Sequence, residues 1–186
     1  MSNKLCIIYV ETNDLHSDMK EILIKKNLYC FARLVSLRYE IGYVKDNEFI
    51  SLKKVMSIVK PRCMYITDEA IKIHGITNEI AESKGIEIEQ ILNTFIKDLK
   101  DVDIIITYNI DFHLTTILAE YIRYNIKFSF ADFIIIDIKT FYHKLDNPSL
   151  SNLYDYLFPD NDKSLDKIDI IKTCFLKLYD DYEKTC

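Results

Sequence analysis

The sequence predicts an α/β fold in which helices flank a mixed five-stranded sheet. Three observations predict it. Residues 5–10 form an uninterrupted apolar run, which is typical of a strand buried on both faces. Residues 28–45 and 48–60, rich in β-branched and aromatic side chains, follow before any long helical pattern. Helical periodicity and short apolar runs then alternate along the chain, which indicates crossover connections between parallel strands.

The first three strands are expected to form an antiparallel meander. Asp46-Asn47-Glu48 has the composition of a tight turn between the second and third of them. Pro61 ends the third strand. Residues 17–26 are polar and are expected to form a loop or a short helix. The strands are expected at residues 4–12, 28–45 and 48–60.

Helices and strands alternate in the rest of the chain. Thr67, followed by two acidic residues, is a typical helix N-cap, and Gly75 ends that helix. Apolar residues from Ile88 to Leu99 recur at helical spacing. The later elements are expected in this order: a strand at 102–108, a helix at 109–125, a strand at 132–138, short helices at 139–145 and 150–157, and a helix at about 168–182.

The first, fourth and fifth strands are expected to run parallel, so their C-terminal ends lie along one edge of the sheet, where α/β folds bind ligands. Glu11 is the last carboxylate of the first of these strands. A sheet holds such a side chain steady, as metal ligands and catalytic acids require. The alternative is a glutamate that faces water where the strand ends.

Composition bounds the class of protein. A chain of 186 residues with 49% hydrophobic and 28% charged residues is expected to be one domain over residues 1–186. No apolar run is long enough to cross a membrane, and no signal-peptide pattern begins the chain. The net charge of −5 argues against indiscriminate binding of phosphate backbones.

Cysteine usage indicates the compartment. The five cysteines show no CxxC or CxxH spacing, so reduced thiols in a cytoplasmic protein are expected, and neither a zinc site nor a disulfide framework is. Abundant Ile, Lys, Asn and Tyr with 3 Gly and no Trp is the usage of an AT-rich genome, such as that of a large DNA virus or a protist.

Several motifs follow one another in a known order. The motifs are residues 58–61, residues 67–70, the stretch Ile73-His74-Gly75-Ile76-Thr77, residues 108–112 with Glu120, residues 133–140 and the helix after Ser149. In this order they resemble the DEDD-type 3′→5′ exonucleases. The resemblance is to the histidine-bearing branch of that superfamily and covers residues 5 to about 178. It implies a ribonuclease H-like exonuclease fold.

The resemblance also implies a site. In that family four carboxylates hold two divalent metal ions and a histidine takes the proton of the attacking water. Five residues of this chain fall on those positions: Tyr9, Glu11, His113, Ser164 and Asp169. Glu11 and Asp169 keep the family's carboxylates and are the metal ligands it implies. Tyr9 replaces the aspartate shared by both metals, His113 the second aspartate, and Ser164 the base. Implied nucleic-acid contacts are Thr12, His74 and Asn109.

Two carboxylates in place of four should bind Mg²⁺ poorly, and loss of a general base typically costs about 10²–10⁴ in rate. The sequence therefore predicts a catalytically degenerate pseudo-exonuclease, a non-catalytic module that binds protein or nucleic acid. Acidity and the loss of metal ligands favour a protein over a nucleic acid as the partner, and a homodimer is also expected, because many members of the family self-associate. A third hypothesis is a subunit or accessory factor of a viral replication or transcription assembly. The alternative is an active 3′→5′ exonuclease with a reworked site that uses Mg²⁺ or Mn²⁺. No cofactor is otherwise expected.

Other assignments stay open. Glu11, His113 and Asp169 are expected to converge, with Ser164 at the rim of the cleft and Tyr9 filling part of the volume that the metals would occupy. Because this set has two carboxylates and one histidine, it could hold a single Mn²⁺, Fe²⁺ or Zn²⁺ ion. Asp111 is expected to cap a helix, the alternative being that it reaches the cleft. Tyr156 and Asp160 have the spacing of a tyrosine variant of the family, which is expected to be a coincidence. His74 is expected to be a structural turn residue. His16 and His143 are expected to lie on the surface.

Overall fold

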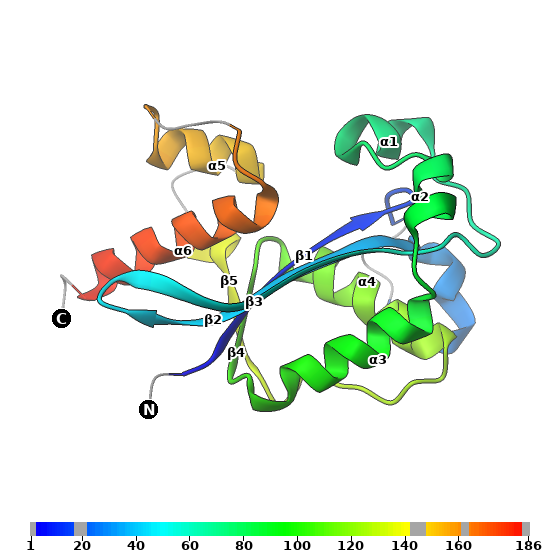
Figure 1. The fold of residues 1–186 in the computed structure, drawn as a ribbon, viewed down its shortest axis with the longest axis horizontal. Helices are drawn as coiled ribbons and strands as arrows, with labels where there is room; N and C mark the ends of the chain where they lie inside the picture. Colours follow the sequence, from blue (N-terminus) through cyan, green and yellow to red (C-terminus); the bar gives the residue numbers. More distant parts are fainter. Residues whose placement is uncertain (1–2, 17–21, 142–147, 161–163, 184–186) are drawn as a thin grey trace.

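In the part of the chain that the structure describes, five strands form one mixed sheet in the order β3-β2-β1-β4-β5 (Figure 1). The computed structural model describes residues 3–16, 22–141, 148–160 and 164–183. β4 and β5 run parallel to β1, β2 is antiparallel to β1, and β3 is antiparallel to β2. These directions confirm the predicted sheet. The strands are β1 (Leu5–Thr12), β2 (Leu34–Lys45), β3 (Glu48–Ile58), β4 (Ile104–Thr107) and β5 (Ile134–Asp137).

The second strand begins later than predicted. Residues Lys25–Cys30 form the 3-10 helix η1 instead of the start of a strand. Asn27 accounts for part of the difference, because its side chain accepts a hydrogen bond from the Ile24 N–H and donates one to the Ile22 carbonyl. Such local side-chain bonds offer the backbone an alternative to a strand ladder.

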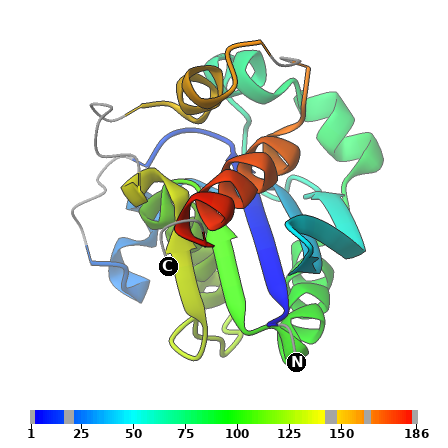
Figure 2. The ribbon, with the colours of Figure 1, turned by 90° about the vertical axis from the view of Figure 1, so that its left-hand side faces the viewer.

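Helices cover both faces of the sheet (Figures 1 and 2). α3 (Ile88–Asp98) and α4 (Ile110–Arg123) pack on one face, and α5 (Leu150–Leu157) and α6 (Lys167–Glu183) on the other. Alternate residues of β1 enter the two cores, because successive strand side chains point to opposite faces. Cys6, Ile8 and Val10 pack with α3 and α4, whereas Leu5 and Ile7 pack with α5 and α6. β1 is thus buried on both faces, as its unbroken apolar run predicts.

Two short helices lie beyond the C-terminal end of β1. Thr67 caps α1 (Asp68–His74), which ends at Gly75 with a positive φ of 74°, and Thr77 caps α2 (Asn78–Lys84). The remaining short elements are the 3-10 helices η2 (Leu99–Asp101) and η3 (Ile138–Phe141). The rest of the helix expected at 139–145 lies outside the described residues. Among the helices that the structure describes, none has the length and apolar character of a membrane span.

The start of α4 is capped by a residue that the sequence did not indicate. The Asp137 carboxylate, at the end of β5, accepts hydrogen bonds from the Asn109 N–H at 2.9 Å and the Ile110 N–H at 2.8 Å. Asn109 itself has a φ of 66° and no side-chain capping bond. The prediction that Asp111 caps this helix is therefore wrong, because the neighbouring parallel strand already supplies the acceptor.

A buried ion network joins α4 to the start of β2. The Glu120 carboxylate is fully buried and accepts hydrogen bonds from Arg33 Nε at 2.8 Å, the Leu34 N–H at 3.1 Å and Arg123 Nη1 at 2.8 Å. Arg123 also donates to the carbonyls of Leu28 and Phe31, so the same network holds η1.

We expect Glu120→Ala to lower the free energy of unfolding by about 3 kcal/mol or more, because it leaves two partly buried guanidinium groups and a backbone N–H without their acceptor. Urea unfolding measures this change. Glu82→Ala is the control: Glu82 pairs with Lys60 on the surface, so its loss should cost less than about 1 kcal/mol. Equal effects of the two substitutions would contradict the structural role of Glu120.

Candidate functional site

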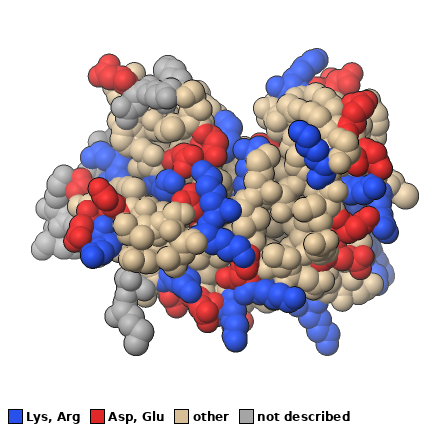
Figure 3. Space-filling view, in the orientation of Figure 1, with Lys and Arg blue, Asp and Glu red and all other residues tan. Residues whose placement is uncertain are grey.

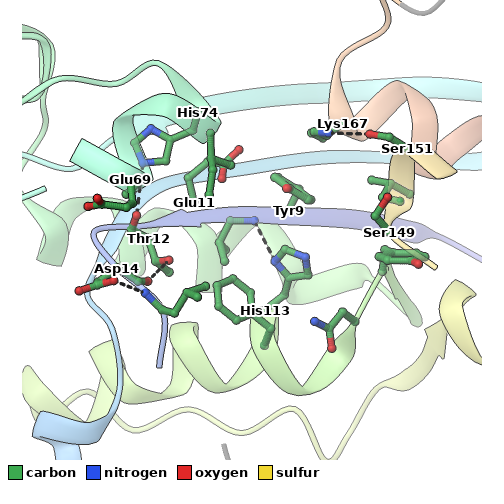
Figure 4. A pocket seen from close by; sticks show the side chains of 18 residues that line it. Tyr9, Glu11, Thr12, Asp14, Glu69, His74, His113, Ser149, Ser151 and Lys167 are labelled. Carbon is green, nitrogen blue, oxygen red and sulfur yellow. Dashed lines mark hydrogen bonds between the residues drawn. The ribbon is translucent and has the colours of Figure 1, made fainter. Parts of the chain in front are cut away.

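A pocket of about 470 Å³ lies at the C-terminal end of β1. We call it the β1 pocket; its wall includes Tyr9, Glu11 and Thr12 of β1, His74 of α1, His113 of α4 and Lys167 of α6 (Figure 4). The surface is hollowed between the part built from α5 and α6 and the part built from α1 and α2 (Figure 3). Parallel α/β sheets bind their ligands at this edge.

Glu11 is the buried carboxylate of the pocket. The residue is 8% exposed, and its carboxylate forms no hydrogen bond or ion pair with any described residue. Burial raises the pKa of Glu11, while the charges of Arg38 and Lys167 oppose that rise. The carboxylate thus lacks a close partner within the described part of the chain, although a buried charge ordinarily has one.

Tyr9 contributes a neutral phenol. Burial, and then the charge of Glu11, raise its pKa well above the ordinary value. Its ring lies against the His113 imidazole, with 4.7 Å between the ring centroids. A neutral phenol cannot replace a carboxylate that bridges two cations.

His113 is held by backbone groups. Its Nδ1 accepts a hydrogen bond from the Val10 N–H at 3.2 Å, and the ring also bonds to the backbone of Tyr108. Pairing between β1 and β4 ends at Ile7, so the imidazole provides Val10 with the acceptor that a longer β4 would have supplied. Burial lowers the pKa of His113 to about 3. It is therefore a neutral residue that completes the sheet edge.

Asp169 is bound by two lysines. Lys172 Nζ lies 2.7 Å and Lys54 Nζ 3.0 Å from its carboxylate oxygens. Partial burial would raise the pKa of Asp169, but these hydrogen bonds outweigh it and hold the pKa below the ordinary value. Lys172 also binds the buried Glu40 at 3.1 Å.

The structure does not bring Asp169 together with Glu11 and His113. Lys172 binds both Asp169 and Glu40, and Glu40 pairs with Ile7 across the sheet. Glu11 pairs with Ser36, which lies four residues from Glu40 along β2. Four strand residues span about 13 Å. Asp169 is not part of the pocket wall. The physical reason is that Lys54 approaches from β3 and Lys172 from the same helix, so Asp169 is neutralised over β2 and β3.

Ser164 is exposed and lies three residues before α6, outside the pocket wall. Tyr156, Asp160 and Asp111 are not part of that wall either. The residues implied as nucleic-acid contacts, Thr12, His74 and Asn109, all line the pocket.

His74 bonds to backbone at both nitrogens: Nδ1 accepts from the Ile76 N–H at 3.0 Å, and Nε2 lies 3.3 Å from the Thr12 carbonyl. This confirms the structural turn role predicted for it. The prediction that His16 lies on the surface is wrong. His16 is 9% exposed, accepts from the Ala32 N–H and contacts Thr116 Oγ1, because α4 packs over it. His143 lies outside the described residues.

Three residues near the site were missed from the sequence. Asp137 carried the same signal as Glu11, a carboxylate at the C-terminal end of a parallel strand. Lys167 lines the pocket and its Nζ lies 3.3 Å from Ser151 Oγ. The charge of Arg38 acts on Tyr9, Glu11 and His74. No sequence pattern marks Lys167 or Arg38 as a site residue, because only tertiary packing brings each of them to the site.

The residues present do not fit the two-metal centre that the exonuclease resemblance implies. Within the described ranges, no group of three or more His, Cys, Asp or Glu side chains is placed to hold a metal ion. The alternative of a single ion held by Glu11, His113 and Asp169 does not fit either, because His113 Nδ1 and the Asp169 carboxylate already have partners elsewhere.

A family model matches the chain. The model of the RNase_T family, described as "Exonuclease", matches residues 38–166, more than half of the chain. Glu11 lies 27 residues before that segment, and Asp169 lies three residues after it. No curated protein sequence matches the chain.

Solved exonuclease structures share the fold. The nuclease domain of 3′hExo, described as a DEDDh family member bound to rAMP, has a TM-score of 0.73 at 15% identity over 97% of this chain and 93% of that one. A 3′-exonuclease described with a histone mRNA stem-loop has a TM-score of 0.72 at 17% identity over 97% and 83%. An E. coli ExoI–ssDNA complex in its zinc-bound form has a TM-score of 0.63 at 15% identity over 96% and 40%.

The chain spans 42% of the product-bound exonuclease I chain, so it is much shorter than that protein. At these identities the likeness shows the fold alone. It confirms the ribonuclease H-like exonuclease fold predicted from the sequence.

We expect the His113 imidazole to stay neutral from pH 8 to pH 5, because burial lowers its pKa to about 3. The unfolded chain protonates this ring below about pH 6.5. Between these values the unfolded state binds more protons, so the free energy of unfolding falls as pH falls, by at most about 1.4 kcal/mol per pH unit from this group. NMR titration of the imidazole resonances tests the assignment.

His113→Asn is the matched variant, since it keeps an acceptor for the Val10 N–H but has no titrating ring. We expect it to lose less stability than the wild type between pH 6.5 and pH 4, measured by urea unfolding at each pH. A His113 resonance that titrates with a midpoint near pH 6 would contradict the account.

Proposed function

The chain belongs to the RNase_T exonuclease family, and from that premise we propose that it is a catalytically inactive member that binds its ligand without cleaving it. The observation that carries the proposal is the pairing of Asp169 with Lys54 and Lys172. Asp169 and Glu11 are the two carboxylates of the family site that this chain keeps. The two lysines bind Asp169 outside the pocket, whereas Glu11 lines the pocket.

The chemistry of the remaining groups supports the same proposal. Two-metal hydrolysis needs anionic oxygens that gather two divalent cations beside the reacting phosphate. Tyr9 offers a neutral phenol, and His113 offers a neutral ring whose Nδ1 is bonded to Val10. Ser164 lies outside the pocket wall and is too weak a base to activate water. The proposal is therefore a pseudo-exonuclease that keeps the fold as a binding module.

The retained pocket favours the end of a nucleic acid as the ligand. Thr12, His74 and Asn109 line it, as the family resemblance implied for nucleic-acid contacts. Proteins of this fold have been described with rAMP and with single-stranded DNA. A protein partner, a homodimer, a place in a viral assembly and a cytoplasmic location stay predictions of the sequence.

We expect no cleavage of labelled single-stranded DNA or RNA above background in Mg²⁺ or Mn²⁺, because the groups that build the reaction are absent or engaged elsewhere. Gel analysis of the products measures this. Turnover by the wild-type chain that both EDTA and Glu11→Ala abolish would overturn the proposal. Turnover that Glu11→Ala leaves unchanged would instead identify a contaminating nuclease.

Restoring one group is also expected to recover nothing, because residues that act as a unit fail together. Tyr9→Asp alone should stay at background in the same assay. The triple variant Tyr9→Asp, His113→Asp, Ser164→His is the matched comparison, and we expect at most a trace of activity from it. Strong activity of Tyr9→Asp alone would show that the other positions are still competent.

A further inference from the structure

Within the part of the chain that the structure describes, three neighbouring side chains have polar atoms without a hydrogen-bond partner. Ser36 Oγ and Arg38 Nε are buried and unpaired, and the Glu11 carboxylate has no partner within the described residues. Glu11 stands opposite Ser36, and Tyr9 opposite Arg38, so the three side chains share one face of the sheet. Folded proteins leave few buried polar groups unpaired, and each such group calls for a water, an ion or a ligand.

Two positive charges act on this carboxylate. The charges of Arg38 and Lys167 both act on Glu11, and Arg38 also acts on Tyr9 and His74. Two positive charges thus stand near one buried negative charge, which leaves this part of the pocket electropositive. Asp14 and Glu69 also line the pocket, but both are exposed and lie toward α1, away from Lys167 (Figure 4). Solvent and salt screen such exposed charges.

The α5–α6 side of the pocket carries several donors. The Lys167 ammonium lies 3.3 Å from Ser151 Oγ, and the Ser149 hydroxyl lies on the same side (Figure 4). An ammonium with adjacent hydroxyl groups is suited to the oxygens of a phosphate group. Apolar residues continue the wall, among them Leu15, Ile73 and Phe112. These can contact the base of a nucleotide, and a volume of about 470 Å³ falls within the range of small-ligand pockets.

From these observations we propose that the β1 pocket binds the phosphate of a nucleotide without a metal ion, with Lys167 as its charged contact and Arg38 as a supporting cation. The proposal rests on the proposed function and names the ligand class and the residues of that binding site. Glu11 accepts a hydrogen bond from a ligand hydroxyl. The cations of the chain thereby occupy the electrostatic role that divalent ions fill in a two-metal site.

Isothermal titration calorimetry of the full chain in EDTA tests the proposal with three probes: adenosine 5′-monophosphate, adenosine and inorganic phosphate. We expect adenosine 5′-monophosphate to bind and adenosine to bind at least about tenfold more weakly, because it lacks the charge-assisted contacts. Inorganic phosphate should compete with the nucleotide. The proposal would be overturned if adenosine 5′-monophosphate did not compete with inorganic phosphate, or if it bound no more tightly than adenosine.

Variants assign the contacts. Lys167→Ala should weaken nucleotide binding about tenfold or more, and Lys167→Arg should restore most of it. Arg38→Gln should weaken it severalfold. Lys97→Ala, at an exposed position of α3 on the opposite face of the sheet, is the matched control and should bind as the wild type does. Thermal melting of each variant checks that it folds, and the comparison of probes on the wild type holds whether or not a variant folds.

Glu11→Gln separates the proposed site from a metal site. Removing a negative charge beside a metal-free phosphate should tighten nucleotide binding severalfold, whereas removing a metal ligand should weaken it. Binding that needs added Mg²⁺ or Mn²⁺ and weakens in Glu11→Gln would overturn the inference, and so would unchanged binding in Lys167→Ala. Cleavage of DNA or RNA tests the proposed function separately, since a chain that fails to bind the nucleotide can still be inactive.

Discussion

Burial of β1 on both faces is the constraint on which the rest of the structure depends. Its alternate side chains enter two separate cores, one under α3 and α4 and one under α5 and α6. The strand therefore fixes the position of both helical layers, and the polar residues at its C-terminal end come to lie where those layers meet. Val10 and Glu11 illustrate the consequence: one has its N–H bonded to His113, and the other has a buried carboxylate that faces the pocket.

Lysine and arginine side chains act on the carboxylates on the α6 side of the sheet. Lys54 and Lys172 neutralise Asp169, and Lys172 also binds Glu40, which is 2% exposed. The charges of Lys167 and Arg38 act on Glu11. Bound cations are often the largest charges in a nuclease-type site, so a chain that supplies its own cations there changes which ligands the pocket accepts. The pocket is suited to hold an anion and poorly suited to gather divalent ions.

The elements that the sequence predicted well are those with strong local patterns. The unbroken run of β1, the helical spacing from Ile88 to Leu99 and the cap at Thr67 each specify an element without reference to distant residues. The site was less predictable. Asp169 could be aligned with the family motif, but its lysine partner Lys54 comes from β3, 115 positions away in the sequence. The burial of His16 likewise depends on α4 and on Ala32.

Binding of Mn²⁺ tests the central claim most directly, namely that the carboxylates of this exonuclease fold no longer form a metal centre. Electron paramagnetic resonance of free Mn²⁺ counts the ions that the full chain removes from solution at neutral pH. The account predicts no saturable binding at micromolar Mn²⁺, with Glu11→Ala and Asp169→Ala indistinguishable from the wild type. Saturable uptake of one or two ions per chain, lost in both variants, would contradict it.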